Sequence, residues 1–343
     1  MSRPLLEVRD LTLRYETTQG GFNAVESVSF SLDRGQSLGL VGESGGGKTS
    51  LGLALMKLLP DNGRLTSGQI MLDGVDLFPL TDDQMRPYRW NRISMVFQAA
   101  MNSLNPVYRV GDQIAEAIEA HQRISHRQAM VTVADLFDLM GLDRDFVNRY
   151  PHEYSGGMKQ RAVIAMALAC EPDLIIADEP TTALDVITQD RILRQLRTLQ
   201  RQLNMAMIYV THDIGVVAEV TDYLGVMYAG RLVELGKTSE VLSRPRHPYT
   251  AALISSFPSV TGERREPVAL EGEPPDLTME SEGCRFAGRC AYSTEVCATI
   301  EPTLVDHLGH RYACWNPLDG VLEHLATHET ERTIIESGEV PAR

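Results

Sequence analysis

The sequence predicts an α/β protein built on a mostly parallel sheet. Short apolar runs with strand character alternate along the chain with longer stretches of helical periodicity, and this alternation is typical of sheets whose strands are connected by helices. A glycine-rich turn at residues 42–49 follows one apolar run and precedes a helical pattern. The chain has 343 residues, which corresponds to about two domains at roughly 100 to 200 residues each.

The expected strands share short runs rich in apolar and β-branched residues. They lie at residues 5–8, 24–32, 36–41, 69–72, 93–97, 173–177, 206–210 and 223–228, with a Thr-Thr-Gln-Gly-Gly loop between the first two. The expected helices repeat apolar side chains every three or four residues. They follow residue 49 and lie at about 110–121, 126–140, 155–170 and 187–203. Because residues 110–170 contain no convincing strand, we expect a helical insertion there.

Composition excludes several classes of protein. With 43% apolar residues the chain is not disordered or fibrous. Its longest apolar run, residues 162–170, is far shorter than the ~20 residues of a membrane helix, and Glu7 and Arg9 interrupt any signal-peptide core, so we expect a cytosolic protein. The formal net charge of −14 disfavours nucleic acid as a partner and direct adhesion to anionic lipid. Any membrane association is therefore expected to come through a protein.

Residues 42–49 have the sequence Gly-Glu-Ser-Gly-Gly-Gly-Lys-Thr and fit the phosphate-binding pattern G-x-x-x-x-G-K-[ST]. In this pattern, backbone N–H groups and the positive end of the following helix converge on a phosphate chain. Lys48 is expected to contact the β and γ phosphates, and the Thr49 hydroxyl to bind Mg²⁺. The other expected contacts are Gly42, Ser44, Gly45, Gly46, Gly47 and Ser50. The alternative is a glycine turn with an incidental lysine, and the position between a strand and a helix favours the phosphate site.

Two adjacent carboxylates, Asp178 and Glu179, end an apolar run. Burying both without a metal ion or a proton is costly, which disfavours a merely acidic strand end. Hydrolysis of a nucleotide requires a carboxylate for the metal ion and a group that polarises the attacking water. We expect Asp178 to bind Mg²⁺ and Glu179 to act as the general base.

These motifs, in this order, resemble the ATP-binding cassette (ABC) family over about residues 5–256. Residues 154–161, Tyr-Ser-Gly-Gly-Met-Lys-Gln-Arg, are similar to its signature sequence. Gln98 lies in a segment like its glutamine loop, Asp185 in its D-loop, and His212 is similar to its switch histidine. Tyr15 lies where the family places an aromatic ring against adenine, although ordinary packing is the alternative for this residue.

The resemblance implies a P-loop NTPase core of ABC type with a mostly parallel sheet, an antiparallel β subdomain and the helical insertion. It implies that Ser155, Gly156 and Gly157 close on the γ-phosphate of an ATP held by the opposite subunit. His212 would contact that phosphate and hold Glu179 and the water in line, and Gln98 would touch the metal ion and the water. A structural role is the alternative for His212.

Two motifs depart from the family pattern. The signature has Tyr and Met where Leu and Gln are commoner, and Gly46 stands where many members carry Ser. Neither departure removes a group assigned to catalysis. Their expected effects are limited to rate and closure affinity.

Narrower segments resemble one branch, the ATPases of oligopeptide and dipeptide importers. These segments are residues 101–106, 149–152 and 246–250 and the cysteine-bearing C-terminal extension. This branch implies two transmembrane permease subunits, a second ABC ATPase subunit and an extracytoplasmic solute-binding protein. A nonidentical paralogue is the expected second ATPase, and an identical copy is the alternative. It implies a peripheral position at the cytoplasmic face of the inner membrane. Relatives of this branch also serve nickel, glutathione and oligosaccharides.

Proline and charge become frequent after residue 244, and we expect a boundary near residue 260. Residues 1–260 would form the ATPase domain, with the helical subdomain at about 110–170, and residues 261–343 an extension that ends in an acidic tail.

The extension contains Cys284, Cys290, Cys297 and Cys314, with five, six and sixteen residues between them. Disulfides are not expected in a reducing cytosol, and paired C-x-x-C zinc knuckles are absent from the sequence. Four thiolates from an irregular loop can hold an iron–sulfur cluster. The branch implies a 4Fe–4S cluster on this pattern, with zinc and free thiols as alternatives.

The expected function is an ATPase that energises peptide import, with ATP and Mg²⁺ as ligands. A soluble ABC ATPase acting in translation or DNA repair is one alternative. Against it, the chain shows neither a tandem repeat nor coiled-coil heptads. The other alternative is a nucleotide-closed binding module whose hydrolysis is dispensable.

Overall fold

The computed structural model describes residues 3–18, 20–182, 184–256, 270–279 and 281–318. The expected boundary at residue 260 and the acidic tail at 319–343 lie outside these residues. None of the helices in the described ranges is both long enough and apolar enough to cross a membrane.

The large sheet has eight strands in the order β11-β12-β10-β9-β3-β8-β7-β6. Its parallel part consists of β9 (Tyr223–Tyr228), β3 (Ser37–Val41), β8 (Ala206–Val210), β7 (Leu174–Asp178) and β6 (Ile93–Val96). Every residue of β3, β7 and β8 is buried, as continuous apolar strands in a sheet covered on both faces must be. The prediction of a mostly parallel core is confirmed.

A second sheet is antiparallel, with the order β2-β1-β4-β5. Its strands are β2 (Gly20–Leu32), β1 (Leu6–Thr17), β4 (Gly63–Leu72) and β5 (Val75–Asp76). The first two strands pair as far as Thr17 and Gly20, so most of the expected five-residue loop belongs to them. The sequence underestimated these strands because polar side chains such as Glu16 line their outer ends while Leu11 and Leu13 are buried.

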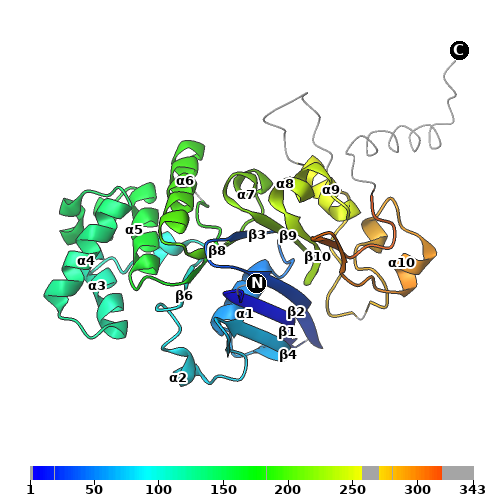
Figure 1. Ribbon diagram of the computed structural model, residues 1–343, viewed down its shortest axis with the longest axis horizontal. Helices are drawn as coiled ribbons and strands as arrows, with labels where there is room; N and C mark the ends of the chain where they lie inside the picture. The colour runs from blue at the N-terminus through cyan, green and yellow to red at the C-terminus, as the bar shows by residue number, and fades with distance from the viewer. Residues whose placement is uncertain (1–2, 19, 183, 257–269, 280, 319–343) are drawn as a thin grey trace, which may run out of the picture.

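The helix α1 (Lys48–Met56) lies in the apolar cluster that both sheets share, with Leu51 and Leu55 fully buried beside Leu6 and Leu38. The insertion forms α3 (Val110–His121), α4 (His126–Leu139) and α5 (Gly156–Leu168) at one end of the molecule, close to α6 (Val186–Gln202) (Figure 1). No strand occurs between residues 110 and 170, all of which are described. The helical insertion is therefore present as predicted.

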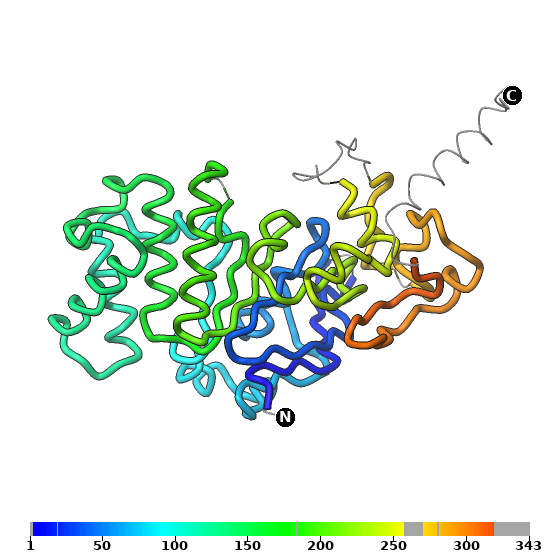
Figure 2. The backbone as a smooth tube through the Cα atoms, turned by 45° about the horizontal axis from the view of Figure 1, so that its top comes forward, coloured from blue at the N-terminus to red at the C-terminus, as the bar shows by residue number. Residues whose placement is uncertain are grey.

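The C-terminal part lies at the opposite end of the molecule (Figure 2). It begins with β10 (Arg231–Lys237), and the later hairpin of β11 (Val305–His307) and β12 (His310–Tyr312) pairs with that strand. The helices of this part are α8 (Thr238–Ser243), α9 (Pro248–Ser255) and α10 (Glu295–Thr299). Of the other helices, α7 (Ile214–Val220) precedes β9, and the short α2 (Asp82–Met85) follows β5 of the antiparallel sheet. The cysteine-bearing segment thus extends the large sheet.

A buried carboxylate fixes this junction. Glu234 of β10 accepts hydrogen bonds from the backbone N–H groups of Arg246 at 2.7 Å and His247 at 2.9 Å. Its Oε1 also lies 2.7 Å from Nε2 of His310 in β12. A carboxylate without access to water needs such partners, and here they come from two separate segments of the chain.

Candidate functional site

The glycine-rich turn connects the buried end of β3 to the first turn of α1. Gly42 and Gly47 have φ values of 148° and 95°, a region that glycine adopts most easily. A Cβ at Gly42 would lie 2.1 Å from the carbonyl oxygen of Met227, and one at Gly47 would lie 2.2 Å from that of Ala24. Close backbone packing therefore requires glycine at both ends of the loop, while Ser44 and Gly45 lie exposed at its rim.

Lys48 lies inside the loop and is only 7% exposed. Its Nζ donates hydrogen bonds to the carbonyl oxygens of Gly42 at 2.7 Å and Glu43 at 2.9 Å. Burial lowers the pKa of this lysine. The loop thus surrounds a cation with backbone carbonyls and places it beside the N-terminus of a helix, an arrangement that suits an anionic ligand.

Asp178 ends β7 and is buried. The Thr49 hydroxyl donates a hydrogen bond to its Oδ1 at 3.2 Å, and burial raises the pKa of the Asp178 carboxyl. A buried carboxylate next to a hydroxyl offers the hard oxygen ligands that Mg²⁺ prefers, and this ion usually needs only one or two protein carboxylates beside phosphate. These two residues therefore fit the expected magnesium site.

Glu179 is the centre of a hydrogen-bonded group. Its Oε1 lies 2.8 Å from Nδ1 of His212, and its Oε2 accepts from Gln98 Nε2 at 3.1 Å and from the Thr182 hydroxyl at 2.9 Å. Partial burial opposes ionisation, but the hydrogen bonds from His212 and Thr182 outweigh it and keep the pKa of Glu179 below its usual range. The carboxylate is thus ionised, oriented and able to accept a proton.

The backbone of Glu179 has a φ of 47°, which is uncommon for a residue with a side chain. Strained conformations of this kind occur preferentially at functional sites. The structure therefore places strain and the converging side chains at the same residue.

Tyr15 and Ser50 lie beside the loop. The Tyr15 hydroxyl donates to the Ser50 hydroxyl at 3.4 Å, and its ring packs against Phe22 with a centroid distance of 5.8 Å. The Tyr15 side chain is half-buried, so one part of it remains accessible.

The signature residues Ser155, Gly156 and Gly157 make no hydrogen bond to the group around Glu179 in the described part of the chain. Ser155 begins α5, where its hydroxyl accepts the N–H of Met158 at 3.3 Å, and a Cβ on Gly156 would meet Leu184. Asp185 accepts the N–H of Thr188 at 2.9 Å and so begins α6. No hydrogen bond within the described part of the chain connects Ser155, Gly156, Gly157 or Asp185 to the phosphate-binding loop. One copy of the chain brings Thr49 to Asp178, and Gln98 and His212 to Glu179, but leaves the signature outside.

Two contacts of this site were missed at the sequence level. The resemblance to the D-loop assigns no role to Thr182, although its position three residues after Glu179 allows a local hydrogen bond. The phosphate-binding pattern leaves position 43 unspecified, and the structure pairs the Glu43 carboxylate with Arg289. No sequence pattern connects residues so far apart.

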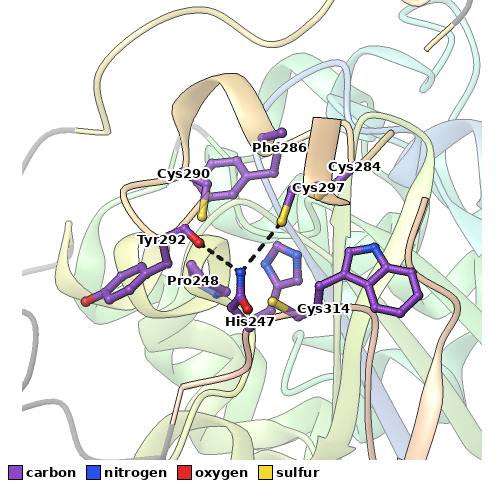
Figure 3. A pocket seen from close by; sticks show the side chains of 11 residues that line it. His247, Pro248, Cys284, Phe286, Cys290, Tyr292, Cys297 and Cys314 are labelled. Carbon is purple, nitrogen blue, oxygen red and sulfur yellow. Dashed lines mark hydrogen bonds between the residues drawn. The ribbon is translucent and has the colours of Figure 1, made fainter. Parts of the chain in front are cut away.

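The four cysteines of the extension line one pocket, together with His247 and Phe286 (Figure 3). Burial raises the pKa of Cys290 to about 11 and that of Cys314 to about 12. Asn316 donates to Cys297 Sγ at 3.8 Å and to the Tyr292 carbonyl at 3.1 Å. Among the described residues, no group of three His, Cys, Asp or Glu side chains could hold a single metal ion. The four thiols thus line one pocket without forming such a group in the described part of the chain.

The phosphate-binding loop, the magnesium-type pair and the proton acceptor define a nucleotide-hydrolysing α/β protein. Comparison with known proteins is more specific. Residues 25–182 match the family model described as "ABC transporter", and residues 233–297 match "Oligopeptide/dipeptide transporter, C-terminal region".

Similar proteins agree with both matches. The oligopeptide transport ATP-binding protein OppD of Bacillus subtilis is 45% identical over 304 residues, which cover 88% of this chain and 85% of the relative. OppD of Salmonella typhimurium is 42% identical, over 93% of this chain and 95% of the relative. Among solved structures, the dimeric structure of MJ0796, a bacterial ABC transporter cassette, has a TM-score of 0.62 and 27% identity, covering 68% of this chain and 98% of that one. The chain belongs to the ABC transporter family, as a cassette that hydrolyses ATP.

Proposed function

We propose that the chain is the ATP-hydrolysing subunit of an importer for dipeptides and oligopeptides. The similarity of 88–93% of its length, including residues 233–297, to peptide transport ATP-binding proteins carries this proposal. Nickel, glutathione and oligosaccharides remain candidate solutes, because the ATPase subunit does not itself contact the cargo.

In the proposed site, the triphosphate of ATP binds along the backbone N–H groups of residues 42–50, and Lys48 binds the β and γ phosphates. Thr49 and Asp178 would hold Mg²⁺, with Gln98 near it. When bound, this ion neutralises charge on the phosphates. Tyr15 would stack on the adenine ring.

Glu179 would accept the proton of the attacking water. Its pKa lies below the usual range and its carboxylate is held by His212, Gln98 and Thr182, so the acceptor is ionised and positioned before the substrate arrives. His212 is 61% exposed along its side chain, which leaves it accessible to a γ-phosphate.

A second copy or a paralogue would complete the site. Ser155, Gly156 and Gly157 open a 13-residue helix at the surface, where its free N–H groups attract an anion. Together with the Asp185 segment they would close on ATP held by the opposite subunit. The dimeric cassette with a similar fold supports this arrangement. We propose a nonidentical ATPase partner, two permease subunits and a solute-binding protein, with this chain peripheral at the cytoplasmic face of the membrane.

We further propose that Cys284, Cys290, Cys297 and Cys314 hold a 4Fe–4S cluster in an extension that begins near residue 260. The four thiols line a common pocket although they come from a loop-rich segment, and this supports the donor set. The bound cluster would supply cross-links that a segment with little apolar content lacks.

Replacement of Cys314 by Ser is expected to lower bound iron and sulfide and the cluster absorbance at least about tenfold, because a cluster without its fourth thiolate is labile. Anaerobic purification followed by iron and sulfide analysis measures this loss. Cys170 is buried just after α5 and lies outside the extension, so Cys170→Ala is the control and keeps the iron content of the parent protein. Zinc in place of iron in the parent protein, or no metal at all, would contradict the proposal.

The proposed function is tested by mild-detergent purification from native membranes through a tag on this chain. Recovery of two permeases and a second cassette ATPase, with ATP turnover stimulated by a peptide-loaded binding protein, is the expected result. Recovery with ribosomes or bound to DNA-repair proteins would favour a soluble ABC ATPase instead.

A further inference from the structure

One arginine of the cysteine-bearing extension reaches the phosphate-binding loop. Arg289 Nη1 donates to Glu43 Oε2 at 2.7 Å, and Nη2 donates to Glu43 Oε1 at 2.9 Å. These two parallel hydrogen bonds form a bidentate ion pair, which fixes orientation as well as distance. Glu43 is the second residue of the loop, and 246 positions separate it from Arg289.

The side chain of Arg289 is largely buried, whereas that of its partner Glu43 is 29% exposed. The Arg289 side chain is only 7% exposed, and its guanidinium carbon lies 5.7 Å from the centroid of the Tyr228 ring. The Tyr228 hydroxyl accepts from Nη1 at 3.2 Å, and the Glu271 carbonyl accepts from Nε at 2.9 Å. The two charges of an ion pair held in this way interact more strongly than those of a fully exposed pair.

Glu43 transmits this contact to the centre of the nucleotide site. Its carbonyl oxygen accepts the Lys48 ammonium at 2.9 Å, and its N–H donates to the Tyr249 hydroxyl at 2.9 Å. One residue therefore connects Arg289 to the lysine of the loop. The negative charge of Glu43 also acts on Lys48, the lysine proposed to bind the β and γ phosphates, and Arg289 neutralises that charge.

Arg289 is itself fixed by the cysteine pocket. It ends a short 3₁₀ turn, residues 287–289, and Cys290 follows directly. The Ala287 N–H donates to the Cys284 carbonyl at 2.9 Å, and the Cys290 N–H donates to the Ala287 carbonyl at 3.3 Å. Whatever holds Cys284 and Cys290 in place therefore also holds Arg289 against Glu43.

We propose that Arg289 is a positioning residue for ATP binding, through which the cysteine-bearing extension sets the charge and geometry of the phosphate-binding loop. This inference rests on the proposed binding of ATP at residues 42–50. Loss of Arg289 would leave the Glu43 carboxylate unpaired beside the triphosphate, and its repulsion would weaken nucleotide binding.

The test is a double-mutant cycle on the full-length chain, with a fluorescent methylanthraniloyl-ATP and Mg²⁺ as the probe. Arg289→Met is expected to raise the Kd about tenfold or more, since one uncompensated charge then faces several phosphate charges. Adding Glu43→Gln to Arg289→Met removes that charge and is expected to restore the Kd to within about threefold of the parent protein. A residue that only holds the extension in place would not be rescued by this second change.

Arg285, which lies just before this turn, offers a matched control. Its side chain pairs with Glu26 and the Ala229 carbonyl rather than with the phosphate-binding loop. Arg285→Met is therefore expected to weaken attachment of the extension, and Glu43→Gln should not reverse any change that it causes. The rise in KM for ATP caused by Arg289→Met should exceed its effect on kcat, because Glu179 and His212 keep their contacts.

Glu43→Gln alone covers the case in which Arg289→Met fails to fold. It keeps an oxygen for Arg289 but removes the negative charge, so the Kd is expected to fall or stay level. A weaker Kd in Glu43→Gln, or an unchanged Kd in a folded Arg289→Met, would overturn the inference. Absence of nucleotide binding by the parent protein would instead contradict the proposed function.

Discussion

Replacing Glu179 by Gln is expected to lower ATP turnover by about 10²- to 10⁴-fold, because a carboxamide cannot accept the proton of the attacking water. The substitution preserves shape, and Thr182 and Gln98 can still form hydrogen bonds to the side chain. Nucleotide affinity should therefore remain within about threefold of the parent protein, a pattern expected when only transition-state stabilisation is lost. Steady-state phosphate release and a fluorescent nucleotide titration measure the two quantities separately.

The matched control for this prediction is Glu116→Gln. Glu116 is exposed on α3, in the helical insertion and far along the chain from the site. It should leave both turnover and affinity unchanged. Undiminished transport by Glu179→Gln would contradict the assignment and would favour a nucleotide-closed binding module whose hydrolysis is dispensable.

Replacing Lys48 by Met is expected to raise the Kd for ATP by about 10- to 100-fold, since a hydrogen bond to a charged group contributes about 1.5–3 kcal/mol. Burial lowers the pKa of Lys48, which means that the protein without nucleotide holds this cation at a cost. The expected result is a folded protein that has lost the rise in Tm produced by ATP in the parent protein.

Thermal unfolding with and without nucleotide checks this second prediction. Lys237→Met removes an exposed lysine at the end of β10 and is the control, with the ATP-dependent rise in Tm intact. An unchanged nucleotide response in Lys48→Met would show that ATP does not bind at the glycine-rich loop.

The parts of the fold that could be predicted are those whose pattern is local. β8 and β9 lie where the continuous apolar runs at 206–210 and 223–228 placed them, because strands buried on both faces leave uninterrupted apolar sequence. The helix α3 has the predicted limits since its apolar periodicity is undisturbed. The strand β10 is not among the expected strands because its apolar run contains Glu234, a residue type usually found at the surface. The buried Glu234 carboxylate is hydrogen-bonded by Arg246 and His310, which no local pattern connects to it.

The site shows the same division. Lys48, Thr49, Asp178 and Glu179 were predicted because each lies in a short motif that also dictates local backbone geometry. The sequence could not indicate that Gln98 and His212 meet at one carboxylate, since their proximity depends on the order of strands in the sheet. Their assignment came from resemblance to a family. Neither a local sequence pattern nor a family motif predicts the contact between Glu43 and Arg289.

The central claim is that ATP turnover at Glu179 drives solute import, and peptide uptake into proteoliposomes containing the purified complex tests it most directly. The vesicles contain ATP and Mg²⁺ on the side that this chain faces, and the peptide-loaded binding protein is added on the opposite side. Vesicles with the parent complex or with Glu116→Gln should then accumulate labelled peptide on the ATP side. Glu179→Gln should bind ATP but accumulate none above the level without nucleotide. Equal accumulation by Glu179→Gln and the parent complex would contradict the account.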